Sequence, residues 1–189
     1  MTTTAIFVEI VIIGLFGVVW IILLLTRLSI LNLTALASVA RNAPDWSTLI
    51  LVGIGAIAYQ VGSLINTLCY GLMERVAGTR LRNSILKEDQ HVVRATLFSQ
   101  GSSELIAELN SHLTYIRLSR AAIFNFLLLG ITLLTFGTRF WKIAVLSLLI
   151  SFGSYCLWRI IFVFHHQEQL AAYEVVVRMG SLKAGSAEE

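Results

Sequence analysis

Four long apolar runs constrain this chain more than any other feature of its sequence. The hydrocarbon core of a bilayer is about 30 Å thick, and a helix that rises about 1.5 Å per residue crosses it with about 20 residues. Backbone groups in lipid must be satisfied within a helix or a closed barrel, and barrel strands would alternate polar and apolar residues. The runs do not alternate, so helices are predicted. They cover residues 6–25, 49–68, 121–138 and 143–163.

The overall composition agrees with a membrane protein. The 189 residues are 57% hydrophobic and 13% charged, whereas typical soluble domains carry about 25% charged residues. The net charge of +3 is too small and too dispersed to favour a nucleic-acid partner. Cys69 and Cys156 lie in or at the end of apolar runs, which predicts small core residues rather than a disulfide.

The polar segment between the second and third runs is the predicted site of function. Residues 71–120 hold 12 of the chain's 25 charged side chains. The fold class predicted is an all-α polytopic membrane protein with four transmembrane helices and a cytoplasmic helical extension. Its parts are a first helix pair with a surface linker (1–70), a cytoplasmic helical segment (71–120), a second hairpin with a helical extension (121–178) and a disordered tail (179–189).

Turn-forming residues divide the polar segment into two helices. Breaks are predicted at residues 78–79 and 101–103 because glycine, serine and threonine cluster there, with a helix over 85–98 between them. From residue 104, leucine and isoleucine recur at spacings of four and three, and no break precedes the third run. One helix over about 104–138 is therefore expected, running from solvent into lipid.

The remaining connections differ in length. Residues 139–142 alone join the third and fourth runs, which predicts an antiparallel hairpin, and the fourth helix is expected to continue to Arg178. Residues 27–46 read as an amphipathic surface helix or an overhang of the first span, ended by Pro44.

The distribution of lysine and arginine predicts the orientation. Nine of these residues lie in residues 71–120 and the tail, against four in the two opposite loops, and Arg159 lies within the fourth run. The count places both termini and residues 71–120 in the cytoplasm of an inner-membrane protein, although Arg27 directly after the first run points the other way.

Two charges fall inside apolar runs, where they are costly and become candidates for function. Glu9 lies near the start of the first span, and the favoured interpretation is an acid that the dipole at a helix N-terminus stabilises. Glu9 and Arg159 are both expected near the cytoplasmic face, so an ion pair that ties the first span to the fourth is the next interpretation and is preferred over transport. A proton or cation site at Glu9 and an arginine that extends toward lipid phosphates remain alternatives.

The second run carries a polar face beside a small-residue face. Ala58 and Gly62 form a small-x-x-x-small pair that permits close helix packing. The polar side chains serve either as packing contacts or as the lining of a pore in a homo-oligomer. They are Gln60, Ser63, Asn66 and Thr67. Polar residues of the later runs complete either arrangement, namely Asn125, Thr132, Thr135, Ser147, Ser151 and Ser154.

Four arginines of the polar segment are candidates for contact with a partner protein or with anionic lipid headgroups, at about 1 kcal/mol each for lipid. They are Arg75, Arg80, Arg82 and Arg94. A metal site built from Glu108, His112, His165 and His166 is disfavoured because adjacent helical residues point about 100° apart. The sequence also lacks a phosphate-binding glycine loop, a Gly-x-Ser-x-Gly elbow and a Cys-x-x-Cys pair, so no metal, cofactor or catalytic residue is assigned.

Two functions follow from these observations. The first is a non-catalytic scaffold or partner-binding subunit that uses residues 71–120, sits among membrane lipids, self-associates and binds a cytoplasmic protein. The second is a homo-oligomeric channel or pore-forming effector triggered by such a partner. In layout alone, the chain resembles small four-span membrane proteins of bacterial anti-phage systems, and that resemblance implies the second function. A membrane metalloenzyme is the third and weakest possibility.

Overall fold

The computed structural model describes residues 3–32, 34, 35, 38, 47–85, 90–100 and 102–185. This part of the chain is helical and contains no strand. Four helices are long and apolar enough to cross a membrane, judged by length and composition. They are α1 (Thr3–Arg27), α3 (Ser47–Met73), α6 (Ser103–Leu134) and α7 (Trp141–Gly185). The predicted all-helical fold with four such helices is confirmed.

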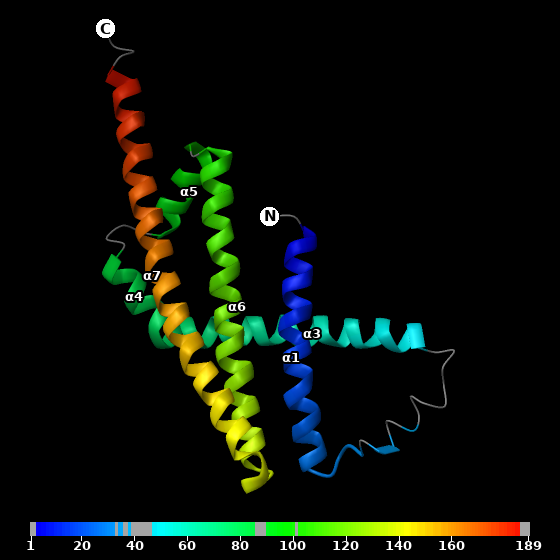
Figure 1. The fold of residues 1–189 in the computed structure, drawn as a ribbon. Coiled ribbons are helices and arrows are strands. Elements are labelled where there is room, and N and C mark those ends of the chain that lie inside the picture. Colours follow the sequence, from blue (N-terminus) through cyan, green and yellow to red (C-terminus); the bar gives the residue numbers. More distant parts are fainter. Residues whose placement is uncertain are drawn as a thin grey trace.

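Helices α6 and α7 form the predicted hairpin. Gly137 adopts a φ of 84°, a left-handed conformation that favours glycine, and the short 3-10 helix η3 (Thr138–Phe140) leads into α7. The two helices then pack against each other along their lengths (Figure 1). Helix α7 has 45 residues, or about 68 Å at 1.5 Å per residue. Residues 179–185 are helical rather than part of a disordered tail, and 186–189 lie outside the described residues.

The start of α6 follows the sequence prediction. Ser102 caps the helix, because its hydroxyl accepts a hydrogen bond from the Leu105 backbone N–H at 3.2 Å. The helix then continues from its charged first half into its apolar second half without interruption and ends at Leu134.

The predicted break at residues 78–79 is absent, because the helix continues there in another form. A π-helical turn, η2 (Glu74–Gly78), joins α3 directly to α4 (Thr79–Ile85). An ion pair between Arg82 and Glu74 spans this turn, and the Thr79 hydroxyl donates to the Glu74 carbonyl at 2.9 Å. Helix α5 (Gln90–Gln100) follows, and residues 86–89 of the predicted 85–98 helix lie outside the described residues.

Helix α3 crosses α1 rather than running alongside it (Figure 1). The crossing is tight at two glycines: a Cβ added at Gly14 would lie 1.6 Å from the Ala58 carbonyl oxygen, and one at Gly62 would lie 2.0 Å from the Ile10 carbonyl oxygen. The small-residue face of the second run therefore packs against α1, as its spacing predicts.

Polar side chains add further ties between the long helices. Asn125 donates to the Ile13 carbonyl at 3.0 Å and accepts from the Trp20 indole at 3.1 Å. The Ser151 hydroxyl donates to the Ile123 carbonyl at 2.8 Å. Asn125 and Ser151 thus serve in packing between helices. The predicted amphipathic helix over 27–46 lies mostly outside the described residues.

The polar segment folds back onto the second half of α7 to form a helical head. We use this name for η2, α4, α5, the first half of α6 and the last 20 or so residues of α7 (Figure 1). Its core consists of Val93, Leu97 and Leu109, with Tyr173 and Val176 of α7 packed against them. A packed head at one end of the long helices positions the site described next.

Candidate functional site

A cavity of about 360 Å³ lies where the head meets the long helices. This volume is at the lower end of the range for small-molecule sites, about 300–1,000 Å³. We call it the junction cavity, and five helices and one π turn contribute to its walls. The lining residues are Asn66, Thr67 and Tyr70 of α3, Glu74 of η2, Arg82 of α4, Arg94 of α5, Leu113, Ile116, Arg117 and Arg120 of α6, and Phe162, His165, His166 and Gln169 of α7.

Carboxylates neutralise two of the four arginines that line this cavity. Arg82 pairs with Glu74, which also lines the wall. Arg117 Nε lies 3.1 Å from Oε1 of Glu9, whose side chain is 5% exposed. Among the described residues, neither Arg94 nor Arg120 has a carboxylate within ion-pair distance. Within the described part of the chain, two guanidinium groups of the cavity therefore have no carboxylate partner.

Arg120 is the most confined of these groups. Arg120 is 7% exposed, and its guanidinium group lies over the Tyr70 ring, 5.1 Å from the ring centre. The cation–π contact stabilises the charge on one side. Its Nε nevertheless lacks a hydrogen-bond partner, and a buried donor left in that state is costly. Arg120 therefore brings a buried donor without a hydrogen-bond partner to the wall of the cavity.

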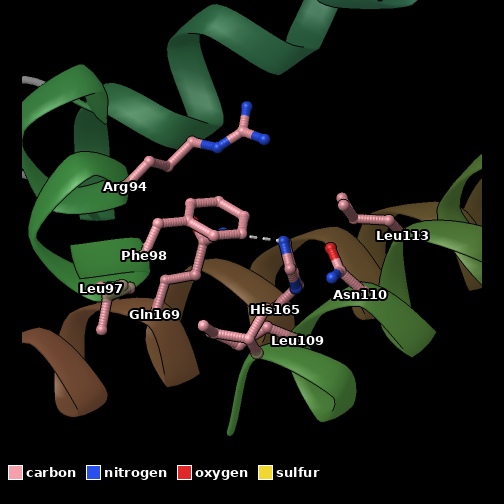
Figure 2. A pocket seen from close by; sticks show the side chains of 9 residues that line it. Arg94, Leu97, Phe98, Leu109, Asn110, Leu113, His165 and Gln169 are labelled. Atoms are coloured by element: carbon pink, nitrogen blue, oxygen red, sulfur yellow. Dashed lines mark hydrogen bonds between the residues drawn. The ribbon is translucent and has the colours of Figure 1, made fainter. Parts of the chain in front are cut away.

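The α7 wall is built from buried neutral groups. His165 and His166 are 2% and 4% exposed. The Gln169 amide nitrogen donates to His165 Nε2 at 3.0 Å, as the dashed line in Figure 2 shows. His166 Nδ1 donates to the Phe162 carbonyl at 2.8 Å. His165 Nδ1 has no hydrogen-bond partner.

A second, smaller space adjoins the junction cavity and shares part of its wall. It measures about 20 Å³, which is room for one water. Figure 2 shows Arg94 reaching over the Phe98 ring above His165 and Gln169. The arginine carbon lies 6.0 Å from the centre of that ring. Arg94 is exposed, so its guanidinium connects the cavity with the surface of the head.

The histidines do not gather around a metal position. His112 Nδ1 lies 2.8 Å from Glu168 Oε2, whereas Glu108 is exposed. The His165 and His166 rings stand 89° apart. Within the described residues, no group of three or more histidine, cysteine or acidic side chains has the arrangement to hold a metal ion.

Glu9 forms an ion pair, but with a different partner from the one that the sequence analysis considered. Glu9 contacts Arg117 of α6 instead of Arg159 of α7, which is exposed. The pair still ties α1 to another long helix, because α6 contacts α1 directly. Arg117 belongs to the polar segment, so sequence position alone gave no reason to pair it with Glu9.

The polar face of α3 is divided by the fold. Asn66 and Thr67 line the junction cavity, whereas Gln60 is exposed and Ser63 is half-buried. The Thr67 hydroxyl donates to the Ser63 carbonyl of its own helix at 2.9 Å.

The four candidate contact arginines are divided in the same way. Arg82 and Arg94 line the cavity, and Arg75 and Arg80 are exposed on the outside of the head.

The polar residues of the cavity that sequence analysis did not assign to a site are Tyr70, Glu74, Arg117, Arg120 and Gln169. A signal for them exists, since each lies where an apolar run gives way to polar sequence. Helices packed side by side bring such positions to one level, where they face each other.

Comparison with protein-family models, curated proteins and solved structures finds no match for this chain. The function must therefore be inferred from the site itself. Its cations, amides and imidazoles are groups that bind and orient a ligand.

Proposed function

We propose that this protein is a non-catalytic membrane subunit that binds a cytoplasmic partner through its helical head. The packing of α5 against α6 and the end of α7, through Val93, Leu97 and Leu109, carries the proposal. This core gives the polar segment a fixed shape instead of leaving it as a loop between spans. A fixed, charged head on membrane helices is suited to present a binding surface.

The dimensions of the helices support insertion with the head outside the bilayer. Helix α7 is more than twice as long as the hydrocarbon core is thick, at about 68 Å against about 30 Å. Its first half exposes large apolar side chains such as Leu149, Phe152 and Ile160, whereas Gln167, Glu174 and Arg178 are exposed in its second half. Such an apolar exterior belongs in lipid or against another protein.

The proposed orientation places both termini and the head in the cytoplasm. The test uses single cysteines at Ser103 and at Lys142, at opposite ends of the hairpin, in a variant lacking Cys69 and Cys156. A membrane-impermeant maleimide is expected to label the cysteine at position 142 in intact cells. The cysteine at position 103 should be labelled only after the cells are lysed. Labelling of Ser103 in intact cells would reverse the orientation.

Arg75 and Arg80 form the proposed contact surface, because they are exposed on the head and do not line the cavity. The test compares Arg75→Glu/Arg80→Glu with Arg139→Glu/Lys142→Glu, a matched double charge reversal at the other end of the hairpin. Proteins cross-linked in intact cells are recovered and quantified for each variant. Loss of a particular protein in the first variant alone is expected, and equal recovery of every protein in both variants would refute the proposed surface.

A pore is the second candidate, and the exposure of α3 favours it. Gln60 and Thr67 are exposed on a helix whose other exposed side chains are mostly apolar. A polar side chain that faces lipid is costly, so a second copy of the chain that covers this face would stabilise it. Recording from purified protein in planar bilayers tests this function: conductance that Gln60→Leu alters would support it, and a tight bilayer at all protein densities would reject it.

A further inference from the structure

We propose that the junction cavity is a binding site for a phosphate group, carried by either a membrane lipid or a soluble phosphate ester. The site goes beyond the partner-binding function, because its residues lie inside the junction and not on the exposed Arg75–Arg80 surface.

The described residues that line the cavity carry more positive than negative charge. Four arginines line the cavity, and the two carboxylates near them, Glu74 and Glu9, are occupied by Arg82 and Arg117. The two remaining guanidinium groups, those of Arg94 and Arg120, come from different helices and line the same space. A phosphate, which can carry two charges and offers several acceptor oxygens, matches such a pair better than a single carboxylate does.

Arg120 supplies the built part of this site. Arg120 is 7% exposed, it lines a cavity large enough for a ligand, and its Nε has no hydrogen-bond partner. A phosphate oxygen that accepts a hydrogen bond from the Arg120 guanidinium group would offset its buried charge. His165 Nδ1 is a second buried nitrogen without a partner on the same wall.

The remaining wall residues explain why the ligand is larger than inorganic phosphate. Leu113, Ile116 and Phe162 add apolar surface to the wall of the cavity. A volume of about 360 Å³ leaves room for an organic group attached to the phosphate. A phosphate ester, with a charged end and a less polar remainder, suits both surfaces.

The position of the cavity accounts for the two possible sources. On α6 it lies at Arg120, directly before the apolar second half of the helix. On α7 it lies at His165, beyond which Gln167, Glu174 and Arg178 are exposed together with Val175 and Val177. In the proposed membrane orientation this is the depth of lipid phosphates. Arg94 is exposed at the same cavity, so a soluble ester could also enter from the head.

Thermal unfolding of the full chain in uncharged, phosphate-free maltoside micelles tests the site. One arm adds glycerol phosphate, the other adds phosphatidic acid to the micelles, and acetate at equal ionic strength is the control anion. Saturation at about a hundred times Kd is expected to raise the Tm by about 5–10 °C with a phosphate ligand and not with acetate. Stabilisation by phosphatidic acid alone identifies a lipid site, and stabilisation by glycerol phosphate identifies a soluble one.

Variants decide whether the junction cavity is responsible. Arg120→Gln and Arg94→Gln are each expected to weaken phosphate binding by about tenfold or more, whereas Arg139→Gln, at the far end of the hairpin, is expected to leave it unchanged. Arg94 is exposed, so its variant remains informative if the buried Arg120 variant fails to fold. Equal stabilisation by acetate, no stabilisation in either arm, or equal binding by the Arg94 and Arg139 variants would each overturn the proposal.

Discussion

The crossing of α1 and α3 leads to a sharp prediction about single methyl groups. In Gly14→Ala the new Cβ must move from 1.6 Å to at least the 3.4 Å of ordinary contact with the Ala58 carbonyl oxygen, a displacement of about 1.8 Å. In Gly62→Ala the corresponding displacement from the Ile10 carbonyl oxygen is about 1.4 Å, from 2.0 Å to 3.4 Å. Because both obstacles are backbone atoms, no side chain can rotate aside and the helices must separate.

The magnitude follows from two opposing effects. Overpacking a tight contact costs about 1–3 kcal/mol or more, whereas replacing a helical glycine with alanine stabilises the helix by about 1 kcal/mol. Gly53→Ala and Gly55→Ala serve as controls, since nothing lies within 4 Å of a Cβ at either position on α3. We therefore expect the Gly14 and Gly62 variants to be about 1–3 kcal/mol less stable than these controls.

Thermal unfolding in mild detergent measures the difference. At about 2–4 °C per kcal/mol for a chain of this size, the Tm of the two crossing variants should lie about 2–12 °C below that of the controls. The double variant should lose less than the combined losses of the single variants, because one separation of the helices relieves both clashes. Equal Tm values for all four single variants would refute the close crossing.

Two further predictions concern the ties between helices. Asn125→Leu removes the hydrogen bonds to the Ile13 carbonyl and the Trp20 indole, and should lower the free energy of unfolding by about 1–2 kcal/mol. Trp20→Phe removes one of these bonds and should cost less. An unchanged Tm of the Asn125→Leu variant would contradict a stabilising role of these hydrogen bonds. Glu9→Gln should destabilise the protein by leaving Arg117 without its buried carboxylate. A double-mutant cycle of Glu9→Gln and Arg117→Gln should show a coupling free energy of about 1 kcal/mol or more. If the losses of unfolding free energy, derived from Tm, simply add, the Glu9–Arg117 ion pair does not contribute to stability.

The positions of the long helices and the connection between α6 and α7 could be predicted from the sequence. Apolar run length predicted the four long helices, and four linking residues after Thr138 were enough to predict the α6–α7 hairpin. The Ala58–Gly62 spacing also predicted a close helix contact, which the structure makes with Gly14. These features depend on neighbours in sequence, so periodicity and length contain the required information.

Features that depend on distant partners could not be predicted in the same way. Glu9 pairs with Arg117 and not with Arg159 because α1 packs against α6. No spacing of residues in the sequence predicts this contact. Gly78 signals a helix end, yet the helix continues because a π turn and the Arg82–Glu74 pair maintain it. The junction cavity combines residues from five helices, so it becomes visible only after assembly.

The unbroken length of α7 has a mechanical consequence. If the 45 residues of α7 move as one rigid body, a tilt of about 5° about the centre of the helix moves each end by about 3 Å. The cavity wall from Phe162 to Gln169 lies near the pivot, with the Gly137 turn at one end and the end of the head at the other. A sub-ångström shift of the cavity wall near the centre of α7 therefore produces a larger displacement at both ends of the helix.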